Sequence, residues 1–232
     1  MNEWGHLIFL HFGDNVIPPV NQDFEELDEL LEETRTSDLQ FVERREYEIR
    51  CNWKVFVDNY LDGGYHVPVL HNALTGQLDL DSYRTRLFSN WSVQTVDGTK
   101  SAAESKPSVD FAERIGSGAT YVWIHPNIML NRYGPILDTN LLLPLDENRT
   151  LVVIDYFFDP AVCADEDFVA RSIAASHLVQ EEDIMICESV QRGLESASYE
   201  KGRYAPSVEQ GELHFHRLLA TSYRNAARMS SG

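Results

Sequence analysis

Cysteine is scarce in this sequence and is not arranged for cross-linking. The three cysteines, Cys51, Cys163 and Cys187, are odd in number and widely spaced, and no Cys-X-X-Cys pair occurs. This spacing excludes a disulfide framework built on paired cysteines. We expect all three to be reduced thiols in the protein core.

Basic residues are also few. The chain carries 19 Lys and Arg against 37 Asp and Glu, which gives a formal net charge of -18. Such a field repels nucleic-acid phosphates and anionic membrane surfaces, so both kinds of partner are excluded. A signal peptide and an apolar run long enough to span a bilayer are missing as well. We therefore expect a soluble intracellular protein, cytoplasmic unless an organelle address has been removed.

The chain shows no internal repeat, and its 232 residues suffice for one substantial core. Strands in a run between helices indicate an α+β domain in which a curved antiparallel sheet grips a helix and leaves a cavity. A Ser- and Gly-rich segment, 100–118, is expected to form a loop over this sheet. The hydrophobic periodicity predicts strands over 39–51, 83–96, 119–124, 139–145 and 151–158, and helices over 24–34, 52–65, 165–198 and 207–228.

The segment 52–71 carries two histidines, His66 and His71. Histidine is the commonest transition-metal ligand, and two imidazoles plus one carboxylate can hold iron(II) with one face open to dioxygen and substrate. The H-E-X-X-H spacing of a zinc protease is absent. The segment therefore predicts most of a mononuclear iron site, although two such histidines can also be ordinary core or surface groups.

Helical spacing predicts how these side chains are directed. Asn59, Asp62 and His66 would share one face of a helix, because positions four and seven apart lie on the same side. An unbroken helix would turn His71 about 140 degrees away from His66. Pro68 is therefore expected to disturb the helix between the two histidines.

The third ligand is expected to be Asp183, from the acidic run 181–183 on the long helix. Glu181 and Glu182 lie well off the apolar stripe of that helix, whereas Asp183 lies in the middle of it. An ionised carboxylate facing a core is costly unless a cation or donors compensate it, so a metal explains Asp183, with a salt bridge or a buried hydrogen bond as the alternative. The stripe consists of Val169, Val179, Ile186, Cys187, Val190 and Leu194.

Four other histidines could compete as ligands, but each alone is more often structural. His214 and His216 are two residues apart, which on a helix sends them to different faces, so they are not expected to share a metal. The remaining two are His125 and His177.

The run Asp58-Asn59-Tyr60-Leu61-Asp62-Gly63-Gly64-Tyr65-His66-Val67-Pro68 resembles the iron-binding signature of the Rieske-type ring-hydroxylating oxygenases, in the catalytic domain of the α subunit. The sequence of this run is most similar to that of the choline monooxygenase branch. Further matching segments extend the resemblance over residues 52–217; they are Pro126-Asn127, Asn131-Arg132-Tyr133-Gly134, Glu182-Asp183, Cys187-Glu188, Gln191-Arg192-Gly193-Leu194 and His214-Phe215-His216-Arg217.

The resemblance implies a helix-grip fold of the Bet v 1 or START type and assembly as a homotrimer. It also implies His66, His71 and Asp183 as the iron ligands. Asp62 would pass an electron in from the Rieske cluster of a neighbouring subunit, and Asn59 is predicted beside it as a second catalytic residue.

One part of the family pattern is missing. The family's N-terminal domain holds a 2Fe-2S cluster on a Cys-X-His and a Cys-X-X-His pair, and none of the three cysteines here has such a partner. Residues 4–12 resemble the last strand of that domain. We therefore expect residues 1–45 to be its remnant with a linker and residues 46–232 to be the mononuclear iron domain. The chain would be a fragment, a short gene model or a naturally Rieske-less form.

The implied reaction is an iron(II)- and dioxygen-dependent hydroxylation of a small organic substrate, with NAD(P)H electrons delivered in trans by a Rieske or ferredoxin donor and a reductase. The choline branch implies a quaternary ammonium substrate held in an aromatic cage, and an aromatic compound is the other candidate. Two rival functions stay open: a non-catalytic ligand-binding module and a regulatory subunit. The cage candidates are Tyr121, Trp123, Tyr133 and Tyr156.

Overall fold

The computed structural model describes residues 1–10, 24–31, 36–71, 77–99 and 114–229. Its centre is a seven-stranded sheet with the strand order β3-β9-β8-β7-β6-β5-β4, and every neighbouring pair in it is antiparallel. The first of these strands therefore lies at one edge, beside the last. The strands are β3 (Gln40–Ile49), β4 (Leu78–Leu87), β5 (Trp91–Gly98), β6 (Gly118–Ile124), β7 (Ile128–Tyr133), β8 (Ile136–Pro144) and β9 (Thr150–Phe158).

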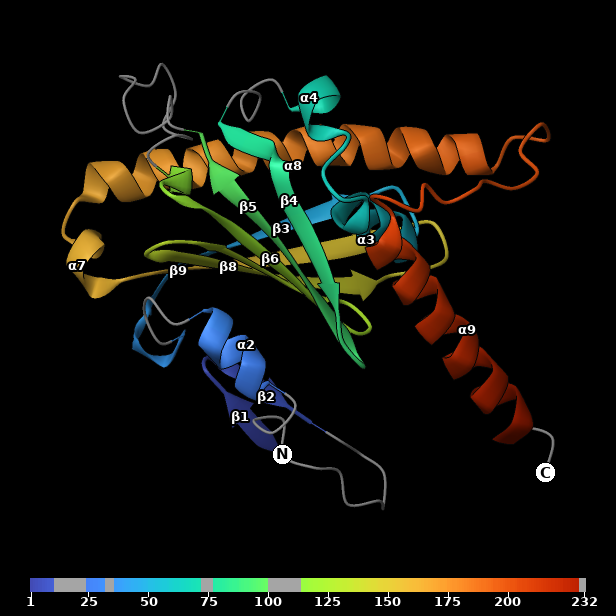
Figure 1. Cartoon of the computed structure of the whole chain (residues 1–232), viewed down its shortest axis with the longest axis horizontal. Coiled ribbons are helices and arrows are strands. Elements are labelled where there is room, and N and C mark those ends of the chain that lie inside the picture. Colours follow the sequence, from blue (N-terminus) through green and yellow to red (C-terminus); the bar gives the residue numbers. More distant parts are fainter. Residues whose placement is uncertain (11–23, 32–35, 72–76, 100–113, 230–232) are drawn as a thin grey trace.

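Helices cover both faces of this sheet. The long helix α8 runs along one face, where α3 and α9 also lie, and α2 lies on the other side with the small hairpin of β1 and β2 (Figure 1). The predicted α+β class is confirmed, and the helix-grip assignment stays a prediction. The elements outside the large sheet are β1 (Asn2–Trp4), β2 (Leu7–Phe9), α2 (Glu25–Leu30), α3 (Trp53–Leu61), α4 (Val67–Leu70), α7 (Pro160–Cys163), α8 (Glu166–Leu194) and α9 (Gln210–Met229).

The alternation of side chains along each strand explains why both faces are covered. On β6, Trp123 packs into the core beneath α3 and α9, while its neighbours Val122 and Ile124 pack into the core beneath α2 and the N-terminal hairpin. Successive strand residues point to opposite faces, so a strand that is apolar at every position needs cover on both sides. The sheet is therefore the middle layer of three.

The sequence prediction of the strands holds for the hairpin of β8 and β9 but is wrong at three places. The single strand expected over 4–12 is a hairpin, in which β2 turns back to pair with β1. The single strand expected over 83–96 is two strands, β4 and β5, joined by a tight turn in which the Phe88 N–H donates to the Trp91 carbonyl at 2.9 Å. Ser89 and Asn90 at the centre of this turn are typical turn residues. Strand β7 was not predicted.

The N-terminal hairpin packs against α2 and its N-cap through Trp4. Its indole Nε1 donates to Asp28 Oδ1 at 2.8 Å, and its ring meets that of Phe24 edge to face at 5.3 Å. The domain boundary at residue 45 stays a prediction. Residues 11 and 12 of the expected N-terminal strand, and residues 100–113 of the expected loop, lie outside the described residues.

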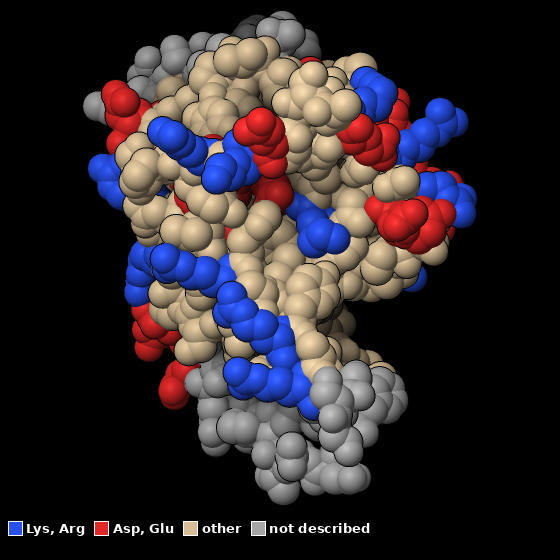
Figure 2. Space-filling model, turned by 90° about the vertical axis from the view of Figure 1, so that its right-hand side faces the viewer, with Lys and Arg blue, Asp and Glu red and all other residues tan. Residues whose placement is uncertain are grey.

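Within the described parts of the chain, no helix combines the length and the apolar character that crossing a membrane requires. The acidic charge is not evenly spread over the surface. On the face that carries α9, Lys and Arg side chains gather in a diagonal band (Figure 2), although the net charge of the chain is -18.

Candidate metal centre and substrate cavity

The backbone around the two histidines is shaped by a pair of glycines. Helix α3 ends at Leu61 because Gly63 and Gly64 adopt φ values of +78° and +77°, which side-chain-bearing residues rarely do. The prediction of one helix over 52–65 is therefore wrong, and Asn59 and His66 do not share a helical face. Pro68 is not the residue that breaks the helix.

The short helix α4 places the two imidazoles side by side. His66 lies at its N-cap and His71 at its C-cap, and Pro68 occupies the first turn, where proline is tolerated. The two ring centroids are 5.0 Å apart. One turn of helix thus brings together two histidines that a continuous helix would have separated.

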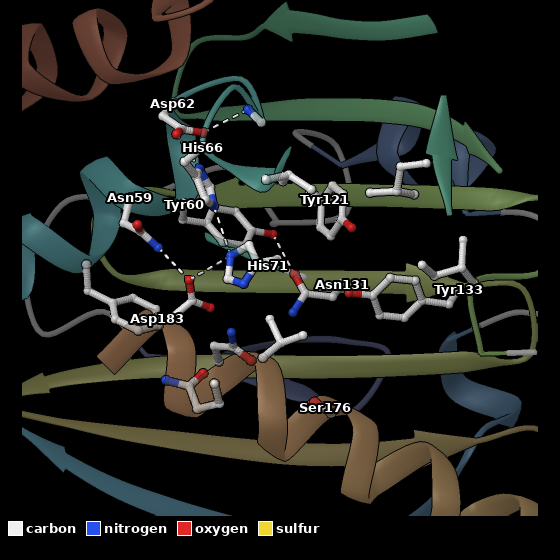
Figure 3. A pocket seen from close by; sticks show the side chains of 18 of the residues that line it. Asn59, Tyr60, Asp62, His66, His71, Tyr121, Asn131, Tyr133, Ser176 and Asp183 are labelled. Carbon is white, nitrogen blue, oxygen red and sulfur yellow. Dashed lines mark hydrogen bonds and ion pairs between the residues drawn. The ribbon is translucent and has the colours of Figure 1, made fainter. Parts of the chain in front are cut away.

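A carboxylate orients each ring. Asp62 pairs with Nδ1 of His66 and also accepts from the Gly64 N–H at 2.7 Å, while Glu182 Oε2 lies 2.8 Å from Nδ1 of His71. An ionised carboxylate can only accept, so each Nδ1 carries the proton and each Nε2 presents its lone pair. The two Nε2 atoms lie 3.1 Å apart (Figure 3).

Two lone pairs at this separation repel each other unless a proton or a cation lies between them. Burial lowers the pKa of His71, but the hydrogen bonds and charges of Asp183 and Glu182 outweigh burial and raise it. The surroundings therefore favour positive charge at this point. Two imidazoles bound at right angles to one metal, each at about 2.1 Å, would have their nitrogens about 3.0 Å apart, so the observed spacing fits a shared ion.

Asp183 completes the group. Its Oδ1 lies 3.3 Å from Nε2 of His71 and accepts a hydrogen bond from Asn59 Nδ2 at 2.8 Å. Within the described residues, His66, His71 and Asp183 form the one cluster of three possible metal ligands, with all three ligand atoms within 4.8 Å of one another. Two histidines and one carboxylate suit non-haem iron(II).

Glu182 is the residue at this centre that the sequence analysis missed. Its position off the apolar stripe argued against it, yet a carboxylate that reaches a ring nitrogen from the edge of a helix face need not lie on that stripe. The predicted apolar stripe also extends too far toward the C-terminus of α8, because Val190 and Leu194 are exposed. The signal for Glu182 in the sequence was its position directly before the candidate ligand Asp183.

A cavity opens beside the three candidate ligands. Tyrosine rings line much of it: Tyr121 lies edge to face with Tyr60 at 6.2 Å and with Tyr133 at 5.9 Å. Burial raises the pKa of Tyr121 to about 12, so its hydroxyl stays neutral. The lining residues include Phe56, Asn59, Tyr60, Asp62, His66, His71, Leu78, Tyr83, Arg114, Ile115, Tyr121, Asn131, Tyr133, Asn140, Ile154, Ser176, Val179, Gln180 and Asp183.

The structure brings only two of the four cage candidates to this cavity, Tyr121 and Tyr133. Trp123 lies in the core, where its indole donates to the Pro126 carbonyl at 3.2 Å. Tyr156 donates to Ser176 Oγ at 3.2 Å and is not among the lining residues. Tyr60 and Tyr83, which the sequence analysis did not select, line the cavity instead.

A buried ion pair closes another part of the cavity wall. Arg114 pairs with Asp138, donates to Ser172 Oγ at 2.6 Å, and places its guanidinium carbon 4.8 Å from the ring centroid of Tyr133. Burial raises the pKa of Asp138 to about 6 although the charge of Arg114 lowers it, so the carboxylate is ionised at neutral pH. The guanidinium is thus already neutralised within the protein.

The other histidines take structural positions. Nδ1 of His177 lies 3.0 Å from the Tyr47 hydroxyl, and Nε2 of His216 lies 2.8 Å from Asp58 Oδ1. His125 and His214 lie edge to face with Trp123. The three cysteines are free thiols, as expected; Cys51 and Cys187 are buried, whereas Cys163, also expected in the core, is half-buried.

Comparison with known proteins identifies the family. Residues 36–225 match the family described as ring hydroxylating alpha subunit (catalytic domain). The chain is 54% identical over 183 residues to the chloroplastic choline monooxygenase of Arabidopsis thaliana, covering 79% of this chain and 42% of that protein. It is 30% identical over 200 residues to the carnitine monooxygenase oxygenase subunit of Escherichia coli K12, covering 81% and 51%. The chain spans about half the length of these relatives.

Solved structures share the fold. The quaternary ammonium Rieske monooxygenase CntA in complex with γ-butyrobetaine superposes with a TM-score of 0.70 at 23% identity, covering 95% of this chain and 59% of that one. Dicamba monooxygenase bound to dicamba gives a TM-score of 0.62 at 20% identity, covering 82% and 60%. The family match, the relatives and the shared fold lead to one conclusion: this chain belongs to the ring-hydroxylating oxygenase α-subunit family, in the region of its catalytic domain.

Proposed function

We propose that this chain binds one iron(II) ion through His66, His71 and Asp183 and hydroxylates a quaternary ammonium compound. The observation that carries the proposal is the 3.1 Å approach of two Nε2 atoms whose Nδ1 partners are both carboxylates. When bound, the iron would supply the activation of dioxygen on its open face.

The residues around the proposed ligands would keep them in place. Asp62 and Glu182 hold the two rings in the tautomer that can bind a metal, and Asn59 occupies one carboxylate oxygen of Asp183. The buried tyrosines would exclude water from the substrate. We retain Asp62 as the proposed entry point for an electron. Asn59, predicted as a second catalytic residue, is proposed here as a positioning residue because its contact is with Asp183.

The proposed reaction needs electrons from other chains. One atom of dioxygen would enter a C–H bond and the other would leave as water, which consumes two electrons and two protons. NAD(P)H would supply the electrons through a reductase and a 2Fe-2S cluster on a partner chain. Inter-subunit electron transfer is described for a solved quaternary ammonium Rieske monooxygenase, and we propose a homotrimer and a helix-grip fold here as well.

The proposed substrate class rests on the cavity and on the relatives. The relatives are named for choline and carnitine, both of which carry a quaternary ammonium group. Aromatic faces bind such cations, and Tyr60, Tyr83, Tyr121 and Tyr133 line the cavity. Several plant relatives are described as chloroplastic. We therefore propose two alternative locations for this chain, the cytoplasm or an organelle.

Metal analysis tests the iron site. Protein purified without oxygen and reconstituted with ferrous iron should hold about one iron per chain, and His71→Ala and Asp183→Ala should lose it. Glu181→Ala is the matched control, because Glu181 lies on the same helix with its side chain 57% exposed and should leave the iron content unchanged. An absence of specific iron in the wild type would reject the oxygenase and favour the non-catalytic binding module.

A further inference from the structure

Two side-chain amides beside the candidate metal centre lack hydrogen-bond partners. Oδ1 of Asn140 and Nε2 of Gln180 are buried, and neither finds a partner among the described residues. Both residues line the cavity, although they are only 5% and 4% exposed. A buried acceptor and a buried donor without partners are costly, so a ligand that satisfies both would be favoured.

Both amides line the cavity that contains the candidate metal ligands, so they can contact a substrate bound there. Gln180 precedes Asp183 by three residues on α8, which is about 4.5 Å along the helix axis. Asn140 lies on β8 opposite Ile154, and Ile154 also lines the cavity. The tyrosines Tyr121 and Tyr133 lie on the far side of the cavity from Asp183 (Figure 3). Gln180 thus lies one helical turn from a candidate ligand, and two tyrosine rings lie away from the candidate ligands. We call the two unpaired amides, Asn140 and Gln180, the amide end of the cavity.

The chemistry of the amide end suits an alcohol and not an acid. A hydroxyl group both donates and accepts, so it can satisfy Asn140 Oδ1 and Gln180 Nε2 together. With Asn140 turned as in the structure, a carboxylate, which only accepts, would leave Asn140 Oδ1 unpaired. Among the described lining residues Arg114 is the one Lys or Arg, and it is already engaged by Asp138 and Ser172.

We propose that Asn140 and Gln180 form a subsite for the hydroxyl group of a trimethylammonium alcohol. The subsite holds the carbon that bears the hydroxyl next to His66, His71 and Asp183, while the cation lies against the tyrosines. The inference rests on the function proposed above and selects an alcohol such as choline over an acid such as γ-butyrobetaine.

The experiment compares matched ligands on the iron-loaded protein under anaerobic conditions. Calorimetric titration measures the affinities for choline, for ethyltrimethylammonium, which lacks only the hydroxyl, and for γ-butyrobetaine. Wild type should bind choline about ten-fold or more tightly than ethyltrimethylammonium, as expected for one or two matched hydrogen bonds. Asn140→Leu and Gln180→Met should each bring this ratio toward one.

Gln94→Met is the control, because Gln94 is also a buried amide with an unpaired oxygen atom but does not line the cavity. It should keep the wild-type ratio. Each protein is compared with itself on two ligands, so a general loss of stability does not change the ratio.

The outcomes separate the two proposals. Equal binding of choline and ethyltrimethylammonium by the wild type, tighter binding of γ-butyrobetaine, or an unchanged preference in both variants would overturn the subsite and leave the proposed function standing. No binding of any of these cations would overturn both. If a variant does not fold, the wild-type ratio still decides.

Discussion

Glu182 Oε2 lies 2.8 Å from Nδ1 of His71, while Oδ1 of Asp183, the next residue in the chain, lies 3.3 Å from Nε2 of the same ring. Neighbouring carboxylates therefore reach the two nitrogens of one imidazole. The first fixes the tautomer and the second is a candidate ligand beside the lone pair. Such outer carboxylates typically strengthen metal binding, which makes Glu182 a positioning residue in the proposed centre.

Removal of Glu182 should therefore weaken iron binding without removing a ligand. We expect Glu182→Ala to lower the affinity for iron(II) by about 10- to 100-fold. Glu182→Gln keeps an oxygen acceptor and should recover part of the loss, while Glu181→Ala should change nothing. Competition with a chelator measures the affinities, and an unchanged affinity in Glu182→Ala would contradict this role.

Gly63 should tolerate no side chain. Its φ is +78°, and a Cβ atom there would lie 2.6 Å from the Val208 carbonyl oxygen. We expect Gly63→Ala to lower the free energy of unfolding by more than about 1 kcal/mol and to weaken iron binding, because His66 follows the turn.

Gly193 offers the matched control for this substitution. It lies near the end of α8, and no atom comes within 4 Å of a Cβ built there. Gly193→Ala should raise the free energy of unfolding by up to about 1 kcal/mol, because alanine favours the helix. Urea denaturation measures both variants, and equal effects would show that the glycine turn is unimportant.

The buried pair of Arg114 and Asp138 should behave unlike an exposed pair. Arg114→Met leaves a buried carboxylate without its partner, at a cost of about 3–5 kcal/mol. Replacing both, as Arg114→Met with Asp138→Leu, should restore much of this loss. Arg44→Met breaks the exposed pair with Asp155 and should cost less than about 1 kcal/mol. A double variant as unstable as Arg114→Met alone would contradict the argument.

Glu212 should make the protein less stable as the pH rises. Burial, together with the charges of Asp58, Glu209 and Asp62, raises the pKa of Glu212 from 4.5 to about 8. Between these two values the folded state holds a proton that the unfolded state has lost, so the free energy of unfolding falls with rising pH and levels off above pH 8.

Glu212→Gln should remove this fall, because the amide is neutral at every pH. The stability advantage of the variant over wild type should grow from pH 5 to pH 8, as measured by urea denaturation at several pH values. A constant difference between Glu212→Gln and wild type would refute the assignment.

Local patterns in the sequence were sufficient for much of the fold. Apolar, strand-forming segments on both sides of the turn at 146–149 predicted the hairpin of β8 and β9, and the acidic start of α8 predicted where that helix begins. The strand prediction failed where the turn signal in the sequence is weak. Ser89 and Asn90 form a two-residue turn between β4 and β5, but the pattern predicted one continuous strand there.

The sequence by itself determined the family and the candidate ligands His66, His71 and Asp183, because a motif and a helical stripe are properties of neighbours along the chain. Only the tertiary structure decided how these residues meet. Asn59 contacts Asp183 across 124 residues, and Glu182 reaches His71 across 111. Such contacts, like the tyrosine wall of the cavity and the unpaired amides of Asn140 and Gln180, depend on how α8 packs across the sheet, and no local pattern encodes that packing.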